Sequence, residues 1–194
     1  MFHSEADFQH ALAWEMHSLD PGSRIRLELR LPEWDPREYL DVWAIWRGCE
    51  VAVELKYKVR KVTVTHDEER FDLRSHAAEN ENRYRFLKDL QRLERFVART
   101  PSAVGYAIFL TNNPGYWTGP RDSTAADWAF RLREGELLTG ALRWRAGTAK
   151  KRGLAEALTL SGKYHLRWRE FSSFPQRSGR FRYLLLKVQT ASDQ

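Results

Sequence analysis

The alternation of apolar and polar residues between positions 40 and 58 constrains the fold more than any other segment of this chain. It runs over Leu40–Trp46 and again over Cys49–Lys58, and Arg47-Gly48 between them is a turn signal. A two-residue turn would pair Trp46 with Cys49. The same register would place apolar residues opposite one another on one face, namely Val42 with Val53, Leu40 with Leu55 and Ala44 with Val51. A slip of one residue would move polar side chains onto that face, so the pattern predicts a β-hairpin in this register.

The opposite face of this hairpin would carry two carboxylates and a lysine. Asp41 would lie directly across from Glu54, and Lys56 would follow about 6.7 Å further along the strand. Two like charges in this position destabilise a sheet, and a hard divalent cation such as Mg²⁺ would relieve the repulsion. Lys56 could then polarise or deprotonate a metal-bound water, or stabilise a charged phosphorane. These residues predict a metal-dependent phosphodiester hydrolase. The alternative is a solvated sheet face with ordinary Glu and Lys side chains.

Length and composition favour one domain from a reducing compartment. A chain of 194 residues with 42% hydrophobic residues can bury a core without cross-links. Its one cysteine, Cys49, cannot form an internal disulfide. The sequence contains no apolar signal segment and no membrane span, which predicts a cytoplasmic protein with no membrane partner.

The basic residues are concentrated towards the C-terminal end. Residues 139–187 contain twelve Lys or Arg and two acids, a net charge of +10, whereas the rest of the chain has −4. Such asymmetry is typical of proteins that bind a polyanion, and aromatic residues alternate with these cations. The expected partner is nucleic acid, with DNA as the first choice and with contacts from Arg143, Arg145, Lys150, Lys151, Arg152, Arg167 and Arg169. A solvated outer face of arginine-rich strands is the alternative, and a homodimer stays open.

The N-terminal segment predicts a helix that packs on the sheet. Ser4 and Asp7 resemble a capping box for a helix over residues 5–18. The buried stripe of this helix is expected to contain Phe8, Ala11, Leu12 and Leu19. Glu15 lies on the same stripe and is a candidate metal ligand, although a partly exposed glutamate at the helix edge is an equal alternative. Glu5 is expected to complement the helix dipole.

The remaining pattern predicts further helices and strands around a buried core. A strand over Arg24–Leu31 precedes the hairpin, a helix over residues 76–99 follows it, and Val104–Leu110 is a strand of the fully buried kind. Near the start of this helix, Arg83 and Tyr84 are expected to reach a phosphate. The other charges of the helix, Asp89 and Arg92 among them, predict ion pairs on a wet face. Antiparallel strands are expected near residues 141–145, 158–171 and 180–189.

The order of helix, strand, hairpin, helix and buried strand resembles the PD-(D/E)XK nuclease superfamily. The residues that carry the resemblance are Asp41, Glu54 and Lys56, and residues 83–89 and 111–117 are similar to an uncharacterised bacterial branch of that superfamily. Leu40 stands where the motif has proline. Because that proline supplies no ligand, the substitution leaves the predicted metal ligands in place.

This resemblance implies a fold, a cofactor and an activity. The fold is α/β (α+β), with a restriction-endonuclease-like αββαβ core in which helices flank a mixed central sheet. Residues 1–194 would form one domain, with the core at about 4–111 and a basic extension of additional antiparallel strands at about 112–194. Asp41 and Glu54 would bind Mg²⁺, or Mn²⁺ in its place, Lys56 would assist the water, and Glu15 would match a first-helix ligand. The implied activity is endo- or exonucleolytic hydrolysis of DNA or RNA. The alternative is a catalytically inactive nucleic-acid-binding or assembly protein, since the superfamily also contains members that no longer cut.

Overall fold

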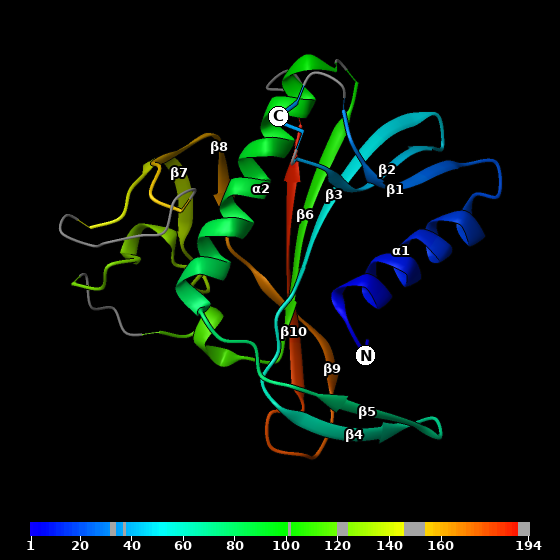
Figure 1. Ribbon diagram of the computed structural model, residues 1–194, viewed down its shortest axis with the longest axis vertical. Helices are drawn as coiled ribbons and strands as arrows, with labels where there is room; N and C mark the ends of the chain where they lie inside the picture. The colour runs from blue at the N-terminus through cyan, green and yellow to red at the C-terminus, as the bar shows by residue number, and fades with distance from the viewer. Residues whose placement is uncertain (32–33, 37, 101, 120–123, 146–153, 190–194) are drawn as a thin grey trace.

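The centre of the molecule is a six-stranded mixed sheet with the strand order β1-β2-β3-β6-β10-β9 (Figure 1). The β3–β6 pair is parallel and the other neighbours are antiparallel. The bounds of these strands are β1 Arg24–Leu29, β2 Leu40–Trp46, β3 Cys49–Tyr57, β6 Val104–Thr111, β9 Trp168–Ser173 and β10 Arg180–Val188. The computed structural model describes residues 1–31, 34–36, 38–100, 102–119, 124–145 and 154–189.

Two helices cover the two faces of this sheet. Helix α1 (Glu5–Leu19) lies on one face and α2 (Glu79–Arg99) on the other (Figure 1). The Ser4 hydroxyl accepts a hydrogen bond from the Asp7 N–H, as the capping pattern predicts. Helix α2 follows Ala78, which has a left-handed backbone (φ 61°). The predicted mixed α/β architecture with a helix-flanked mixed sheet is therefore confirmed.

The smaller elements form two separate ribbons and two short 3₁₀ helices. Strands β4 (Val62–His66) and β5 (Glu69–Leu73) form a hairpin, so Val62 and Val64 do not prolong β3. Strands β7 (Leu137–Leu142) and β8 (Leu158–His165) form the second ribbon, and β8 packs against α2. The 3₁₀ helices are η1 (Pro114–Tyr116) and η2 (Trp128–Phe130). Within the described residues, none of the helices combines the length and apolarity that crossing a membrane requires.

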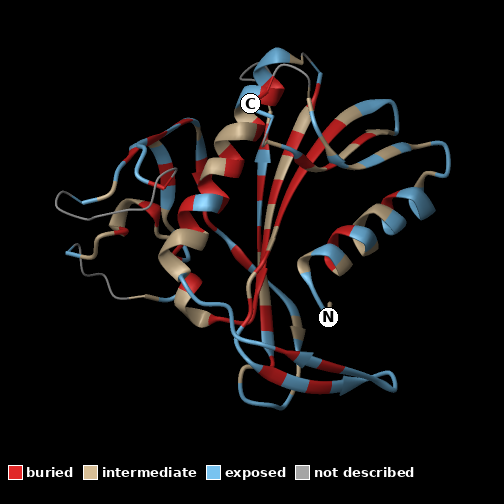
Figure 2. Cartoon of the chain, in the orientation of Figure 1, coloured by how far each residue is buried: buried red, intermediate tan, exposed pale blue. Residues whose placement is uncertain are grey.

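Two apolar clusters lie on opposite sides of the sheet. Along β3, Ala52 belongs to the cluster under α2, whereas Val51, Val53 and Leu55 belong to the cluster under α1. This is the alternation expected of a strand that is covered on both faces. Figure 2 shows the buried residues along the middle strands and on α2.

Leu40 departs from the predicted pattern. It was expected to face Leu55, but it lies in the cluster under α2. The β2–β3 ladder ends at the Val42–Val53 pair, so the pairing no longer fixes the side on which Leu40 lies. Glu28, at the neighbouring position of β1, has φ 51° and interrupts the regular strand conformation there.

The C-terminal strands are part of the main sheet. Seven residue pairs join β10 to β6 in antiparallel register, and β9 forms the edge beyond β10. The predicted strand over residues 158–171 is two strands in the structure, because the chain turns between His165 and Trp168. The extension and the predicted core therefore share one hydrogen-bonded sheet.

Gly48 is the position at which we expect the hairpin to be most sensitive to a small change. Arg47 and Gly48 both have positive φ, 51° and 78°, as a primed two-residue turn requires. Gly48→Ala should lower the free energy of unfolding by about 1 kcal/mol, because an L-residue is strained in this region. Urea unfolding measures the change. Gly22→Ala is the control, since its φ is not left-handed and its Cβ would meet only an ordinary contact. Equal stability of both variants would contradict a φ-imposed requirement at Gly48.

Candidate active site at the end of the hairpin

The hairpin forms in the predicted register and then opens. The ladder runs from the Trp46–Cys49 pair to the Val42–Val53 pair, which confirms the register. It stops one position short of Asp41 and Glu54, so these two residues are not paired through their backbones. Strand β3 continues to Tyr57 beyond the last pair.

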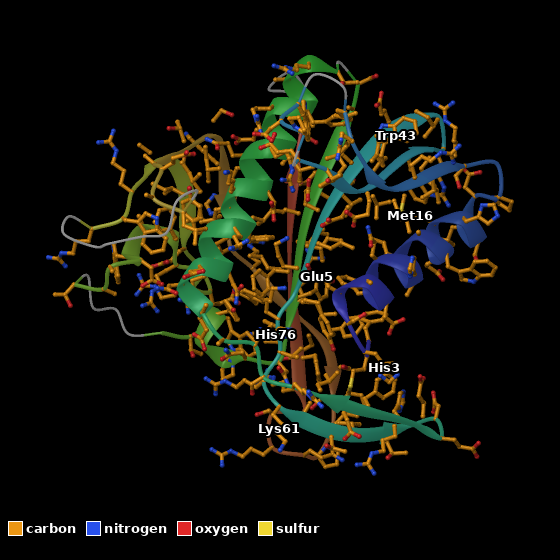
Figure 3. All side chains as sticks on the ribbon, viewed as in Figure 1. His3, Glu5, Met16, Trp43, Lys61 and His76 are labelled. Carbon is orange, nitrogen blue, oxygen red and sulfur yellow. The ribbon has the colours of Figure 1, made fainter. Side chains whose placement is uncertain are left out.

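Carboxylates satisfy the backbone of β3 beyond the end of the ladder. The Asp41 Oδ2 accepts a hydrogen bond from the Leu55 N–H at 2.5 Å. The Glu5 Oε2 accepts one from the Tyr57 N–H at 2.7 Å and another from the Lys58 Nζ at 2.7 Å. Figure 3 labels Glu5 between the first turn of α1 and the sheet. The two carboxylates thus replace β2 as hydrogen-bond partners, because buried N–H groups need acceptors.

Glu54 is buried and held by an arginine from α2. It is 1% exposed, and its Oε1 and Oε2 accept hydrogen bonds from Arg92 Nε at 2.7 Å and Nη2 at 2.6 Å. Arg92 Nη2 also lies 2.8 Å from the Asp89 Oδ1. The fork geometry of this pair is the strongest kind of carboxylate–guanidinium contact.

Lys56 joins the same network from β3. Its Nζ lies 2.8 Å from the Asp89 Oδ2 and 3.1 Å from the carbonyl oxygen of Leu55. The exposed fractions of the Lys56 and Asp89 side chains are 15% and 10%. Three carboxylates and two cations therefore gather between β3, α2 and the start of β2; we call Asp41, Glu54, Lys56, Asp89 and Arg92 the charge cluster.

Burial, together with the excess of carboxylates over cations, shifts the pKa values in the charge cluster. Burial raises the pKa of Asp41 to about 6; Lys56 opposes that rise, and Asp89 and Glu5 add to it. Burial and the nearby Asp89 also raise the pKa of Glu54, against the lowering effect of Arg92. The carboxylates around Lys56, with Asp89 first, outweigh burial and raise the pKa of its ammonium group.

The donor set is suited to a hard cation, but an arginine occupies part of it. Asp41 and Glu54 offer carboxylate oxygens, and Mg²⁺ is typically held by one or two carboxylates with waters and phosphate oxygens. Arg92 engages both oxygens of Glu54 and would have to release one of them. In the described part of the chain, no group of three or more His, Cys, Asp or Glu side chains is arranged to hold a metal ion.

Glu15 does not lie on the buried stripe of α1. The buried residues of this helix are Phe8, Gln9 and Met16, whereas Glu15 is exposed and Leu19 is 55% exposed. Compared with the predicted stripe, the buried side of α1 is rotated towards Gln9 and Met16, and this side faces the hairpin. Gln9 Nε2 donates to the Asp41 carbonyl oxygen at 2.5 Å. The prediction that Glu15 lies on the buried stripe is therefore wrong, and the alternative of a solvent-exposed glutamate fits the structure.

Arg83 and Tyr84 are structural residues, so the expectation that they reach a phosphate is wrong. The Arg83 side chain is 3% exposed, and its guanidinium contacts Asp127 at 2.7 Å and Glu79 at 3.1 Å. Tyr84 is fully buried and stacks on Trp144 at 5.6 Å between ring centroids. The apolar stripe of α2 turns both residues inwards, where two acids neutralise the arginine.

The predicted C-terminal contacts divide into exposed cations and buried aromatics. Arg143, Arg145, Arg167 and Arg169 are exposed, whereas Lys150, Lys151 and Arg152 lie outside the described residues. Tyr164 and Trp168, two of the aromatic residues that alternate with these cations in the sequence, are buried at 6% and 4% exposure.

The sequence pattern did not predict that Asp89, Arg92 and Glu5 contribute to the site. Asp89 and Arg92 were interpreted as a pair on a wet face, and they do form an i,i+3 pair, but on the side of α2 that faces β3. The helical spacing contains a signal, because Asp89 lies three residues after Phe86 and four before Leu93, both fully buried. Only the tertiary contacts place Glu5 next to Tyr57.

A comparison of the chain with protein-family models, with curated proteins and with solved structures found no match.

Arg92→Met tests how strongly α2 holds the charge cluster. We expect it to lower the free energy of unfolding in EDTA by about 3 kcal/mol, because it leaves Glu54 buried without its main partner. Adding Glu54→Gln should restore part of the loss, since the unpaired buried charge disappears. Arg95→Met is the control and should cost less than about 1 kcal/mol, because the Arg95–Glu38 pair is about half exposed on the arginine side. Equal losses in the two variants would contradict this account.

The raised pKa of Asp41 predicts a falling stability with rising pH in metal-free buffer. The folded chain binds more protons than the unfolded chain between pH 3.8 and about 6, so the free energy of unfolding should fall across this window. Asp41→Asn keeps an acceptor for the Leu55 N–H and removes the titration. It should flatten the window and raise stability at pH 7 by roughly 1–3 kcal/mol. Urea unfolding between pH 4 and 8 measures this. Parallel curves of unfolding free energy against pH for the native chain and Asp41→Asn would contradict the prediction.

Proposed function

We propose that this chain is a Mg²⁺-dependent nuclease with a restriction-endonuclease-like fold of the PD-(D/E)XK type. The observation that carries the proposal is the convergence of Asp41 and Lys56, from the two strands of the hairpin, with buried Glu54 and with Asp89 of α2. The order α1, β1, hairpin, α2 and parallel β6 supports the proposed fold. The substrate would be a nucleic acid, because the chain has a net charge of +6 and a basic C-terminal half.

Asp41 and Glu54 would hold the metal ion, Mg²⁺ or Mn²⁺ in its place. Such an ion lowers the pKa of a bound water and withdraws charge from a phosphoryl oxygen. The chain itself contributes the orientation of the ligands. The Leu55 N–H fixes one oxygen of Asp41, and packing between β3 and α2 fixes Glu54. Burial also excludes bulk water from this corner, which strengthens electrostatic interactions within it.

The raised pKa of Lys56 narrows its role. An ammonium group whose pKa is raised stays protonated at neutral pH, so it is a poor proton acceptor. Of the three roles considered for this lysine, its protonated state favours polarisation of water and stabilisation of the negative charge on a phosphorane. Asp89 keeps its Nζ in place, 2.8 Å away. Asp89 is thus a positioning residue in this proposal.

A specific observation favours a second candidate, a nucleic-acid-binding or assembly protein without catalysis. The guanidinium of Arg92 contacts both oxygens of Glu54 and neutralises the carboxylate that would bind the metal. If this contact is permanent, Arg92 takes the place of the cation. The chain would then bind its partner independently of EDTA.

Calorimetry with Mn²⁺ separates the two candidates. The nuclease predicts Mn²⁺ binding by the native chain, loss of binding in Asp41→Asn, and cleavage of a labelled DNA or RNA strand that EDTA abolishes. Alanine at Asp41, Glu54 or Lys56 should reduce the cleavage rate by at least about 10²-fold, and Glu68→Gln, an exposed carboxylate in the β4–β5 turn, is the control. The second candidate predicts no Mn²⁺ binding by the native chain and new Mn²⁺ binding by Arg92→Met. Cleavage that survives in the three alanine variants would disprove the nuclease.

A further inference from the structure

A groove of about 1300 Å³ runs along α2 and reaches the charge cluster. Its lining includes three members of that cluster: Lys56, Asp89 and Arg92. Trp34, Asp35 and Glu38 line one side of the groove, and Leu154, Glu156, Thr159 and Ser161, before and within β8, line the other. The groove therefore connects the surface of α2 with the candidate active site.

A stripe of cations follows the floor of this groove. Five cations of α2 line the groove and follow one another at spacings of three and four residues: Arg85, Lys88, Arg92, Arg95 and Arg99. The first and the last are fourteen positions apart, which is a length of about 21 Å along the helix. Like charges at i,i+3 and i,i+4 destabilise a free helix, so this stripe is unfavourable unless negative charge lies next to it.

The acids of the chain neutralise only part of the stripe. Arg92 contacts Glu54 and Asp89, and Arg95 contacts Glu38 at 3.0 Å. For Arg85 and Lys88, by contrast, no ion pair is found among the described residues. These two cations lie on the turns of α2 that precede Asp89 and Arg92, next to the charge cluster.

The remaining acids along the groove differ in the hydrogen bonds that they accept. Glu94 accepts hydrogen bonds from the N–H groups of Ser161 and Gly162 and from the Tyr164 hydroxyl. Its charge is thus used in holding β8 to α2. Asp35 and Glu156 also line the groove. They do not remove the charge contrast at Arg85 and Lys88, because no ion pair joins them to these cations among the described residues.

The walls of the groove oppose insertion of α2 into the major groove of a duplex. The Gln91 Nε2 donates to the Thr159 carbonyl oxygen at 2.9 Å, so α2 and β8 touch along the groove. The major groove of a duplex is about 12 Å wide, and a helix with its side chains just fills it, so this mode of duplex binding needs a helix surface that is free on both sides. The wall at residues 154–161 blocks that approach. A single phosphodiester strand can instead lie between the walls.

We infer that a single nucleic-acid strand binds along the groove of α2, with Arg85 and Lys88 in contact with its phosphates. The inference rests on the proposed function only in that the bound nucleic-acid strand would extend to the charge cluster. It also relocates the contact surface predicted at the C-terminal strands. The phosphate contacts are common to DNA and RNA, and the probes of the test distinguish these two sources.

Binding of single-stranded probes in EDTA tests the inference without any cleavage. The probes are fluorescent DNA and RNA strands of about 12 nucleotides, a length within the range that one binding groove covers. Arg85→Ala/Lys88→Ala should weaken binding at least tenfold. It should also reduce the slope of log K against log salt by about 1.4, since each phosphate contact contributes about 0.7 for a single strand. Tighter binding of DNA or of RNA identifies the source of the strand, and equal binding identifies the phosphates alone as the feature recognised.

Two further double variants control for net charge and for the alternative surface. Lys61→Ala/Arg74→Ala removes the same charge from exposed positions next to the β4–β5 hairpin and should leave the affinity within about twofold. Arg167→Ala/Arg169→Ala removes it from the C-terminal strands. An equal loss in either control, or tighter binding of a duplex than of a single strand, would overturn the inference.

Binding and cleavage can fail separately. Loss of binding in Arg85→Ala/Lys88→Ala together with no metal-dependent cleavage by the native chain would retain the groove and reject the nuclease. Metal-dependent cleavage by the native chain together with unchanged binding by this variant would retain the nuclease and reject the groove. Thermal unfolding checks that the variant is folded, which we expect because Arg85 is exposed and Lys88 is only partly buried.

Discussion

The buried ion pairs between β3 and α2 are the interaction on which the rest of the site depends. Burying charges is costly unless each has a close partner, and here Glu54, Asp89, Arg92 and Lys56 satisfy one another across the interface. Because the partners come from a strand and from a helix, the contacts fix the position of α2 along the sheet. They also fix the face of α2 that is left for the groove. The same network therefore connects the packing of the core with the two features that we interpret as functional.

The end of the β2–β3 ladder determines where the other acids lie. A strand that continues beyond its neighbour exposes N–H groups, and these need acceptors. Asp41 and Glu5 provide them for Leu55 and Tyr57. Backbone hydrogen bonding thus accounts for the position of Asp41, and together with the Lys58 ammonium for that of Glu5. This is a structural reason for the acids that holds whether or not a metal ion binds, and it is why the metal experiment, rather than the arrangement of the acids, decides the chemistry.

The C-terminal half has a structural role that its net charge did not predict. Its strands complete the main sheet and cover α2, and its aromatic residues pack inside the molecule. Arg83 follows the same principle, since Asp127 and Glu79 hold it within the protein. The net charge of residues 139–187 describes the long-range field of the molecule. It does not say which cations face a partner, and the cations of α2 that line a groove belong to a different segment.

The sequence by itself determined the hairpin, its register, both helices and the buried β6, because these depend on periodicity and turn residues that act over a few positions. It also determined that Asp41, Glu54 and Lys56 belong to one local unit. Only the tertiary structure decided which groups surround them. The contacts of Asp89 with Lys56, of Arg92 with Glu54 and of Glu5 with Tyr57 join residues that are 33, 38 and 52 positions apart in the chain. The rotation of α1 against the sheet decided that Gln9 is buried and Glu15 is exposed. Such contacts follow from how whole elements pack, and the alternation within a single segment contains no information about that packing.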